Sequence, residues 1–390
     1  MKPTANANAN ANANANANAN ANANANANAN AARLGAARYN APHRLPEDVA
    51  ALLALFRLNL GGILTTTSAK AAHTTAAGVA LSAMHYALPH RALARAIDPR
   101  NVDAPTAPRA FIPSLRALAD AYALCERAAA YHACPSATGG CAAACLHQAG
   151  HGGLSVDVVA ARGRRSLAML ADPVTYARAV AYAVAAQLQR AARKGLPVAL
   201  RMNGTTETPW LAQCFPLSTT DAARIRRRYG VDVATGDRLT LADAFAADRE
   251  RGTLRLYEYL KAPVDAPDGL RAWSAAGWDV TASFAADRST AVRDAVAAVR
   301  AGFRVAFPVA LQRGAAPLRS VTLETDRGDV VTLPAVDGDA TDARYNDAPG
   351  AAVILREKRA RGANRAAADR FILPDAPRIV LGDGAVLLTR

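Results

Sequence analysis

The chain has 390 residues, of which 51% are hydrophobic and 20% are charged, so its body should be globular rather than disordered. Five cysteines in so long a chain exclude a small secreted disulfide scaffold. The most apolar early stretch, residues 49–64, contains Arg57 and Asn59 and is too short to cross a bilayer. No secretory signal is visible, and we expect a cytoplasmic protein with reduced thiols and no membrane partner. The net charge of +14 favours attraction to phosphate polyanions.

The first third of the chain mixes low complexity with irregular structure. Residues 1–36 contain thirteen uninterrupted Ala-Asn dipeptides, which offer no apolar face and predict a disordered tail without chemistry. The spacing of Leu and Val predicts an amphipathic helix over 46–60, and the Thr- and Gly-rich stretch 61–78 predicts strand and loop. Four prolines mark an irregular insertion at about 89–112, and a helix over 113–131 should lead into a cysteine-rich loop.

The remainder of the chain has a regular alternation. A helix is expected over 172–194, with Asp172 as its N-cap and Gly195 as its stop. Short apolar strands and helices then alternate, which predicts a parallel sheet with crossover connections. The expected strands are 196–202, 253–260, 278–284 and 303–311, the helices 219–229, 241–250 and 289–302, and the later strands 320–325, 330–336, 351–358 and 378–390.

This pattern predicts an α/β fold. Our first expectation is an incomplete or open (β/α) barrel of parallel strands with an extra β-rich C-terminal segment, and our second is an open doubly wound sheet. Residues 37–373 should form one domain, with the strands of 374–390 packed on it.

The loop "CPSATGGCAAACLHQAGHG", residues 134–152, places Cys134, Cys141 and Cys145 close to His147 and His151. A disulfide leaves one thiol over and is disfavoured in a reducing compartment. Zinc needs a fourth ligand, which His147 or His151 offers, although the spacing matches no standard zinc set. Three cysteines also suit an iron–sulfur cluster with one open iron. The remaining alternative is that the cysteines are only small packing residues.

A second candidate site is "RMNGTTETPW", residues 201–210, which directly follows a predicted buried strand. Functional side chains gather at the carboxyl ends of parallel strands, and a glycine permits close backbone approach. A polar turn in which a Thr caps the next helix is the structural alternative. The candidate residues for binding a cofactor are Arg201, Asn203, Gly204, Thr205, Thr206 and Glu207.

Two further strand ends carry weaker signals. In "YEYLKAP", Tyr257 and Tyr259 share one face of a strand and Lys261 follows it, a pattern more typical of ordinary strand aromatics with a solvated lysine. In "VDGDATDARYND", three acids offer ligands for a cation or an amine, but an Asp-Gly turn between strands is the simpler interpretation. These acids are Asp337, Asp339 and Asp342.

Taken together and in order, the motifs resemble an uncharacterised family of bacteriophage and prophage gene products. The family pattern has a C-P-x-A-x-x-G-C-x-x-x-C-L loop and a strand ending R-L-N-G-T-S-D. Later it has Y-D-Y-T-K, H-L-T-F-S and D-G-D motifs. The corresponding segments here are "CPSATGGCAAACL", "ALRMNGTTE", "YEYLKAP", "DVTASFA" and "VDGDATDARYND", over about residues 50–373. The family carries Asp in place of Glu207 and Arg in place of His151, which argues against His151 as a required ligand.

More distantly, the cysteine loop resembles those of radical SAM-like phage proteins. That resemblance implies a [4Fe–4S] cluster on Cys134, Cys141 and Cys145, with S-adenosylmethionine or the substrate in the strand-end pocket. A nucleotide or nucleic acid is the substrate that the phage context and the positive charge suggest. Two alternatives remain: a nucleic-acid-binding module with a structural zinc loop, or an inactive, diverged copy. The net charge and the basic run 356–365 favour the nucleic-acid-binding module.

Overall fold

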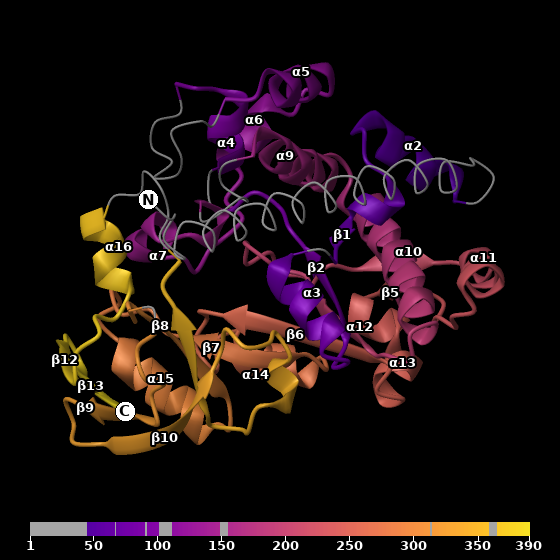
Figure 1. Cartoon of the computed structure of the whole chain (residues 1–390). Helices are drawn as coiled ribbons and strands as arrows, with labels where there is room; N and C mark the ends of the chain where they lie inside the picture. The colour runs from indigo at the N-terminus through magenta and orange to yellow at the C-terminus, as the bar shows by residue number, and fades with distance from the viewer. Residues whose placement is uncertain are drawn as a thin grey trace, which may run out of the picture.

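The computed structural model describes residues 45–66, 68–89, 92–100, 111–148, 155–312, 314–358 and 365–390. Three features of the sequence therefore lie wholly or mainly outside the described residues: the predicted Ala-Asn tail, His151, and the basic run beyond Lys358. In the part that is described, the main feature is an eleven-stranded sheet (Figure 1). Its strands, in spatial order, are β1 (Leu64–Thr65), β2 (Leu81–His85), β3 (Val198–Arg201), β6 (Leu254–Leu260), β7 (Asp279–Ser283), β8 (Arg304–Val309), β11 (Ala352–Arg356), β10 (Val330–Asp337), β9 (Ser320–Thr325), β13 (Gly384–Thr389) and β12 (Arg378–Leu381).

The centre of this sheet is parallel, from β2 through β3, β6, β7, β8 and β11 to β10. The expected mixed α/β fold with a large, mostly parallel sheet is confirmed. A barrel is not, because the sheet ends at β1 and β12 and does not close. The order rises from β1 to β8 without the central reversal that marks a doubly wound sheet. The C-terminal strands β12 and β13 continue the same sheet through the antiparallel pairing of β13 with β9.

The helix α10 (Pro173–Ala192) is at the centre of the core and confirms the expected element. Asp172 accepts a hydrogen bond from the backbone N–H of Thr175, and Gly195 follows the helix with a φ of +64°. Both features are the local signals that begin and end helices. The preceding helix α9 (Val156–Ala171) packs against α10 and was not expected from the sequence.

Several expected helices differ in extent from those observed. The expected helix 113–131 is two helices, α5 (Pro113–Ala121) and α6 (Cys125–Ala130), separated where Ala123 has a φ of +51°. The expected strand and loop over 61–78 is largely wrong, because α3 (Ala69–Ala76) forms there after the N-cap Ser68.

The other helices of the described chain are α2 (Glu47–Leu55), η2 (Leu60–Gly62), α4 (Ala92–Ile97), α7 (Gly139–Ala143), η3 (Leu146–Gln148), α11 (Thr219–Tyr229), α12 (Leu241–Ala244), α13 (Ala246–Glu250), α14 (Leu270–Ala275), α15 (Ala291–Arg300), η4 (Arg344–Asn346) and α16 (Arg365–Phe371). Two further strands, β4 (Phe215–Leu217) and β5 (Gly236–Leu239), pair with each other in a separate small sheet.

The strand β6 has two different faces because successive side chains point to opposite sides of a sheet. Leu254 and Leu256 join the large helical core, whereas Tyr257 and Tyr259 pack in a small cluster with Tyr345 of η4. The rings of Tyr257 and Tyr345 meet edge to face with centroids 6.3 Å apart. The face of β6 that carries the tyrosines is therefore packed against η4, which lies between β10 and β11 in the chain.

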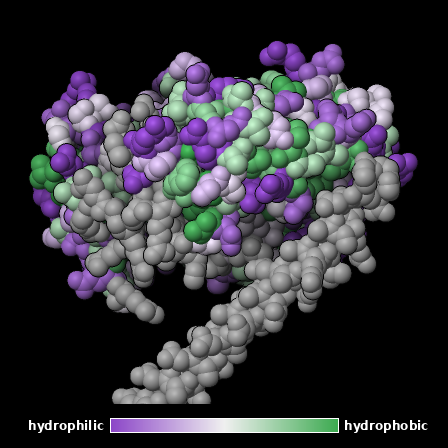
Figure 2. Space-filling view, turned by 90° about the horizontal axis from the view of Figure 1, so that it is seen from above, coloured by the Kyte–Doolittle hydropathy of each residue, from purple (hydrophilic) through white to green (hydrophobic). Residues whose placement is uncertain are grey.

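The outer surface is mixed in character. Figure 1 shows the N-terminal helices gathered at the top of the view and the C-terminal strands at the lower left. On the face seen from above, hydrophobic and hydrophilic residues are interspersed (Figure 2). Among the described helices, none has the length and apolar character that crossing a membrane requires.

Candidate functional site

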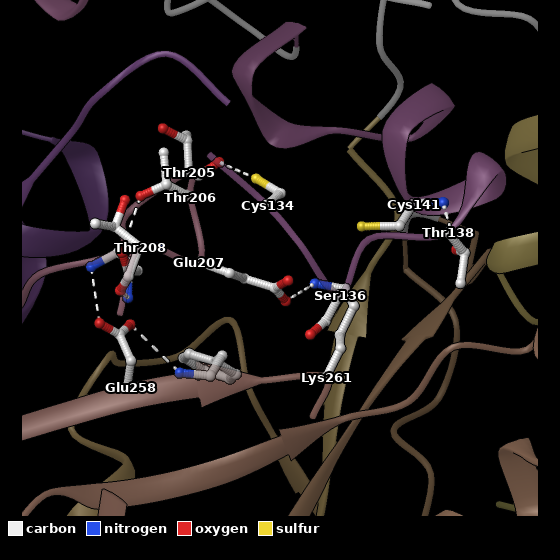
Figure 3. A network of polar contacts seen from close by, with 12 residues as sticks. Cys134, Ser136, Thr138, Cys141, Thr205, Thr206, Glu207, Thr208, Glu258 and Lys261 are labelled. Atoms are coloured by element: carbon white, nitrogen blue, oxygen red, sulfur yellow. Dashed lines mark hydrogen bonds and ion pairs between the residues drawn. The ribbon is translucent and has the colours of Figure 1, made fainter. Parts of the chain in front are cut away.

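A cavity of about 190 Å³ lies where the parallel strands β3, β6, β7, β8 and β11 end. Carboxyl ends of parallel strands are where α/β folds place their ligands. The cavity brings together residues from segments far apart in the chain, and Figure 3 shows their arrangement. The expected site residues that line it are Cys134, Cys141, Cys145, Arg201, Asn203, Gly204, Thr205, Thr206, Glu207, Tyr259, Lys261, Asp339 and Asp342.

The loop after β3 is held by Asn203. Its Oδ1 accepts hydrogen bonds from the hydroxyl of Thr206 at 2.9 Å and from the backbone N–H of Thr208 at 3.0 Å, and its Nδ2 donates to the Thr208 carbonyl. Thr205 donates its hydroxyl to the Ala87 carbonyl. A Cβ on Gly204 would lie 2.5 Å from the ring of Tyr86, so only glycine fits there. These polar residues therefore shape the loop that presents Glu207 to the cavity.

Glu258 of β6 accepts hydrogen bonds from the start of this loop, and it was not among the site residues expected from the sequence. It is fully buried, and its carboxylate accepts the Arg201 Nε–H at 3.2 Å and the Asn203 backbone N–H at 2.8 Å. Burial raises the pKa of Glu258 to about 7, although Arg201 opposes the shift. The Arg201 guanidinium lies over the Tyr259 ring, 4.6 Å from its centroid. The acid stands between the two tyrosines of "YEYLKAP", so its signal in the sequence was an acid on the face of the strand that is otherwise formed by leucines.

The second ion pair of the site joins Glu207 to Lys261. Oε1 of Glu207 lies 2.9 Å from Nζ of Lys261, and the two side chains are only 8% and 14% exposed (Figure 3). Burial alone lowers the pKa of Lys261, but negative charge on the Cys141 sulfur when it is ionised and on the Glu207 carboxylate outweighs burial and raises the pKa overall. Oε2 of Glu207 and the hydroxyl of Tyr259 are both buried and have no hydrogen-bond partner among the described residues. The cavity wall thus carries an acceptor and a hydroxyl that a ligand can satisfy.

The three cysteines lie on the wall opposite the strand ends, and none forms a disulfide. Cys134 Sγ lies 3.8 Å from the Thr205 carbonyl oxygen. Cys141 belongs to α7, whose N-cap Thr138 accepts the Cys141 backbone N–H, and Asp287 accepts the Gly140 backbone N–H at 2.9 Å. Burial raises the pKa of Cys141, and it raises that of Cys145 to about 12. Without a bound cation, these two thiols are therefore protonated at neutral pH.

One expected partner of the cysteines, His147, does not join them. His147 does not line the cavity; its Nδ1 lies 2.6 Å from Nη1 of Arg162. A guanidinium at that distance competes with a metal cation for the imidazole nitrogen. Among the residues that the structure describes, no group of three or more His, Cys, Asp and Glu side chains is gathered closely enough to hold a metal ion.

The acidic loop after β10 reaches the cavity only in part. Asp339 and Asp342 line it, whereas Asp337 and Tyr257 do not. The Asp339 carboxylate accepts the backbone N–H of Arg356 at 2.9 Å and lies 3.7 Å from Nζ of Lys358. The three acids therefore do not converge on one cation, and Asp339 instead ties the loop to the end of β11.

Comparison with known proteins gives a partial assignment. Residues 68–226 match the family described as gene product 88. That region contains both the cysteine loop and the strand-end loop, so the expected resemblance to an uncharacterised phage gene-product family is confirmed there. No curated protein and no solved structure matches the chain. The later motifs, from "YEYLKAP" onward, lie outside the matched region.

Proposed function

We propose that this phage gene-product relative is an iron–sulfur enzyme of the radical SAM-like type, with Cys134, Cys141 and Cys145 as the cluster ligands. One observation carries the proposal: three cysteines outside disulfides share one cavity with the polar loop at the end of β3. A nucleotide or nucleic acid is the proposed substrate class, and the net charge of +14 supports it.

The three cysteine side chains are the kind of ligand that an iron–sulfur cluster requires. Thiolates are the ligands of iron–sulfur clusters, and three of them leave one iron open. Lys261 adds a buried positive charge that stabilises thiolates at Cys141 and Cys134, since the same groups raise its own pKa. The sulfur atoms of the described structure are not gathered closely enough to hold a metal, so cluster binding requires the cysteine loop to rearrange.

When bound, the cluster would supply one-electron chemistry to S-adenosylmethionine at its open iron. The chain's own residues then have separate tasks. Glu207 offers its partnerless Oε2 to a donor group of the ligand, and Lys261 fixes the orientation of that carboxylate. Glu258 holds Arg201 and Asn203 in place. Leu146, Leu355 and Phe371 line the cavity with apolar surface and help to exclude water.

The test is metal analysis of protein purified and reconstituted without oxygen. We expect iron and acid-labile sulfide with broad visible absorption, lost in C134S, C141S and C145S. The matched controls are C125S and C214S, because these cysteines do not line the cavity. Absence of iron from the parent protein contradicts the proposal. About one zinc per chain without colour instead supports a structural zinc loop.

If iron is found, the reaction class needs a second assay. The loaded protein is incubated with S-adenosylmethionine and a strong reductant, and release of 5′-deoxyadenosine is measured by chromatography. We expect release by the parent, and strongly reduced release by E207A, which removes the carboxylate from the cavity wall. A cluster-containing parent that never cleaves the cofactor contradicts the radical part of the proposal alone.

A further inference from the structure

The C-terminal ends of α10 and α11 meet at the surface and carry a cluster of cations. Nε2 of Gln189 donates to the Arg228 carbonyl at 3.0 Å, which joins the last turns of the two helices. In Figure 1 both helices lie at the right of the view. We call the cationic residues of these two ends the basic patch: Arg190, Arg193, Lys194, Arg227 and Arg228.

Four of the five cations of the basic patch have no acidic partner among the described residues. Arg190, Arg193, Lys194 and Arg227 are exposed, and none forms an ion pair with a described residue. Asp232, the acid that follows α11, is paired with Arg226. Cations in the last turn of a helix do favour the helix dipole, but this effect falls off within that turn. It accounts for a cation on each helix and not for five cations held on one surface.

A groove of about 570 Å³ lies at the amino ends of the parallel strands, and the chain enters it just after the basic patch. Pro197, three residues after Lys194, lines this groove together with Arg249, Arg255 and Tyr345. The groove also contains Glu250 and Asp279, the latter bound to Arg304. The cysteine cavity lies at the carboxyl ends of the same strands. The cationic surface and the cavity are therefore at opposite edges of the sheet.

We propose that the basic patch is a binding surface for the phosphate backbone of nucleic acid. Arginine side chains bind phosphate oxygens through a planar, two-pronged donor set. The large hydrophobic residues that are exposed in the described chain lie elsewhere, for example Leu55, Val156 and Val380, so the basic patch has no apolar anchor for a lipid surface. The proposal goes beyond the cavity chemistry, because nucleic acid bound here is held at the edge of the sheet away from the cysteines.

The test compares two variants that lose the same number of positive charges. The patch variant is R190Q/R193Q/K194Q/R227Q, and the control variant R57Q/R127Q/R327Q/R370Q removes exposed arginines from four separate places. Each is titrated by fluorescence anisotropy with a labelled single-stranded DNA and its duplex at several salt concentrations. Each phosphate contact contributes roughly 0.7 to 0.9 to the slope of log K against log salt. We expect the patch variant to lose roughly three units of slope and at least about tenfold in affinity at low salt, and the control to stay within about twofold of the parent.

Equal loss in both variants overturns the proposal, because the attraction then follows net charge and not this surface. If the patch variant keeps the parent's DNA binding but loses its binding to phosphatidylserine vesicles, the basic patch binds membranes and the proposal is overturned. Circular dichroism establishes that both variants are folded. The proposal and the cluster chemistry can fail separately, since iron content is measured in the patch variant and DNA binding in C134S.

Discussion

The buried carboxylate of Glu258 accepts a hydrogen bond from Nε of Arg201 at 3.2 Å, and its other oxygen accepts the backbone N–H of Asn203. The pair joins β6 to the end of β3 beneath the candidate cavity. Arg201 keeps its charge, because the Glu258 carboxylate counteracts the effect of burial and raises the pKa of the guanidinium. Glu258 is thus the residue on which the shape of the strand-end loop depends.

Replacement of Glu258 should change how stability depends on pH. Its pKa is raised from 4.5 to about 7 in the folded protein, so the folded state binds this proton more tightly than the unfolded state. Stability from this group is therefore present below pH 4.5 and is lost as the pH rises to about 7. We expect the parent to lose on the order of 3 kcal/mol relative to E258Q across that window. Urea denaturation of both proteins at several pH values measures the difference, and parallel pH curves contradict the prediction.

A methyl group at Gly204 should destabilise the fold. In G204A the new Cβ meets the Tyr86 ring at 2.5 Å and the His85 carbonyl at 2.9 Å, and neither neighbour can move freely. Overpacking of this kind costs about 1–3 kcal/mol. The control is G139A, because a Cβ on Gly139 meets nothing within 4 Å. Chemical denaturation should show a loss for G204A only, and equal midpoints contradict the structure at this contact.

Removal of the Lys261 charge should make Cys141 less reactive. Burial raises the pKa of the Cys141 thiol, and the Lys261 ammonium opposes that rise by favouring the thiolate. In K261M the opposition is lost, so the pKa rises further and the thiolate fraction falls at any given pH. The rate of Cys141 alkylation by iodoacetamide, followed by mass spectrometry, should fall severalfold, while the rate at Cys214 in the same sample stays unchanged. A faster reaction at Cys141 would instead show that the variant opens the cavity.

Removal of the Asp287 carboxylate, which accepts hydrogen bonds at the start of α7, should affect the exposure of the cysteine loop more than the stability of the whole fold. Asp287 accepts hydrogen bonds from the Thr138 hydroxyl at 2.7 Å and from the Gly140 backbone N–H at 2.9 Å. Loss of a helix cap costs about 1 kcal/mol. We therefore expect D287A to unfold at slightly lower denaturant and to expose Cys141 to alkylation severalfold faster than the parent. The comparison is D243A, which removes the carboxylate of the α12 capping box, far along the chain from the cysteines. If D243A exposes Cys141 equally, the effect is general loosening and not a property of this cap.

Local interactions made part of the fold predictable from the sequence. The helix α10 follows from its cap at Asp172, its apolar spacing and its stop at Gly195, all within one stretch of chain. The strands β3, β6, β7 and β8 follow from short apolar runs between turn residues. The helix α3 and the break at Ala123 were missed, because short Ala-rich segments have no apolar period strong enough to distinguish helix from loop.

The sequence by itself also determined which residue types are available: three cysteines in one loop and a polar loop after a buried strand. Only the tertiary structure decided which of them meet. Glu207 and Lys261 are 54 residues apart and pair because β3 and β6 are neighbours that end at the same edge. His147 faces Arg162, and Tyr257 faces Tyr345, although each stood beside residues that do line the cavity. Burial, pairing and charge depend on what packs from distant parts of the chain, and no local pattern contains that information.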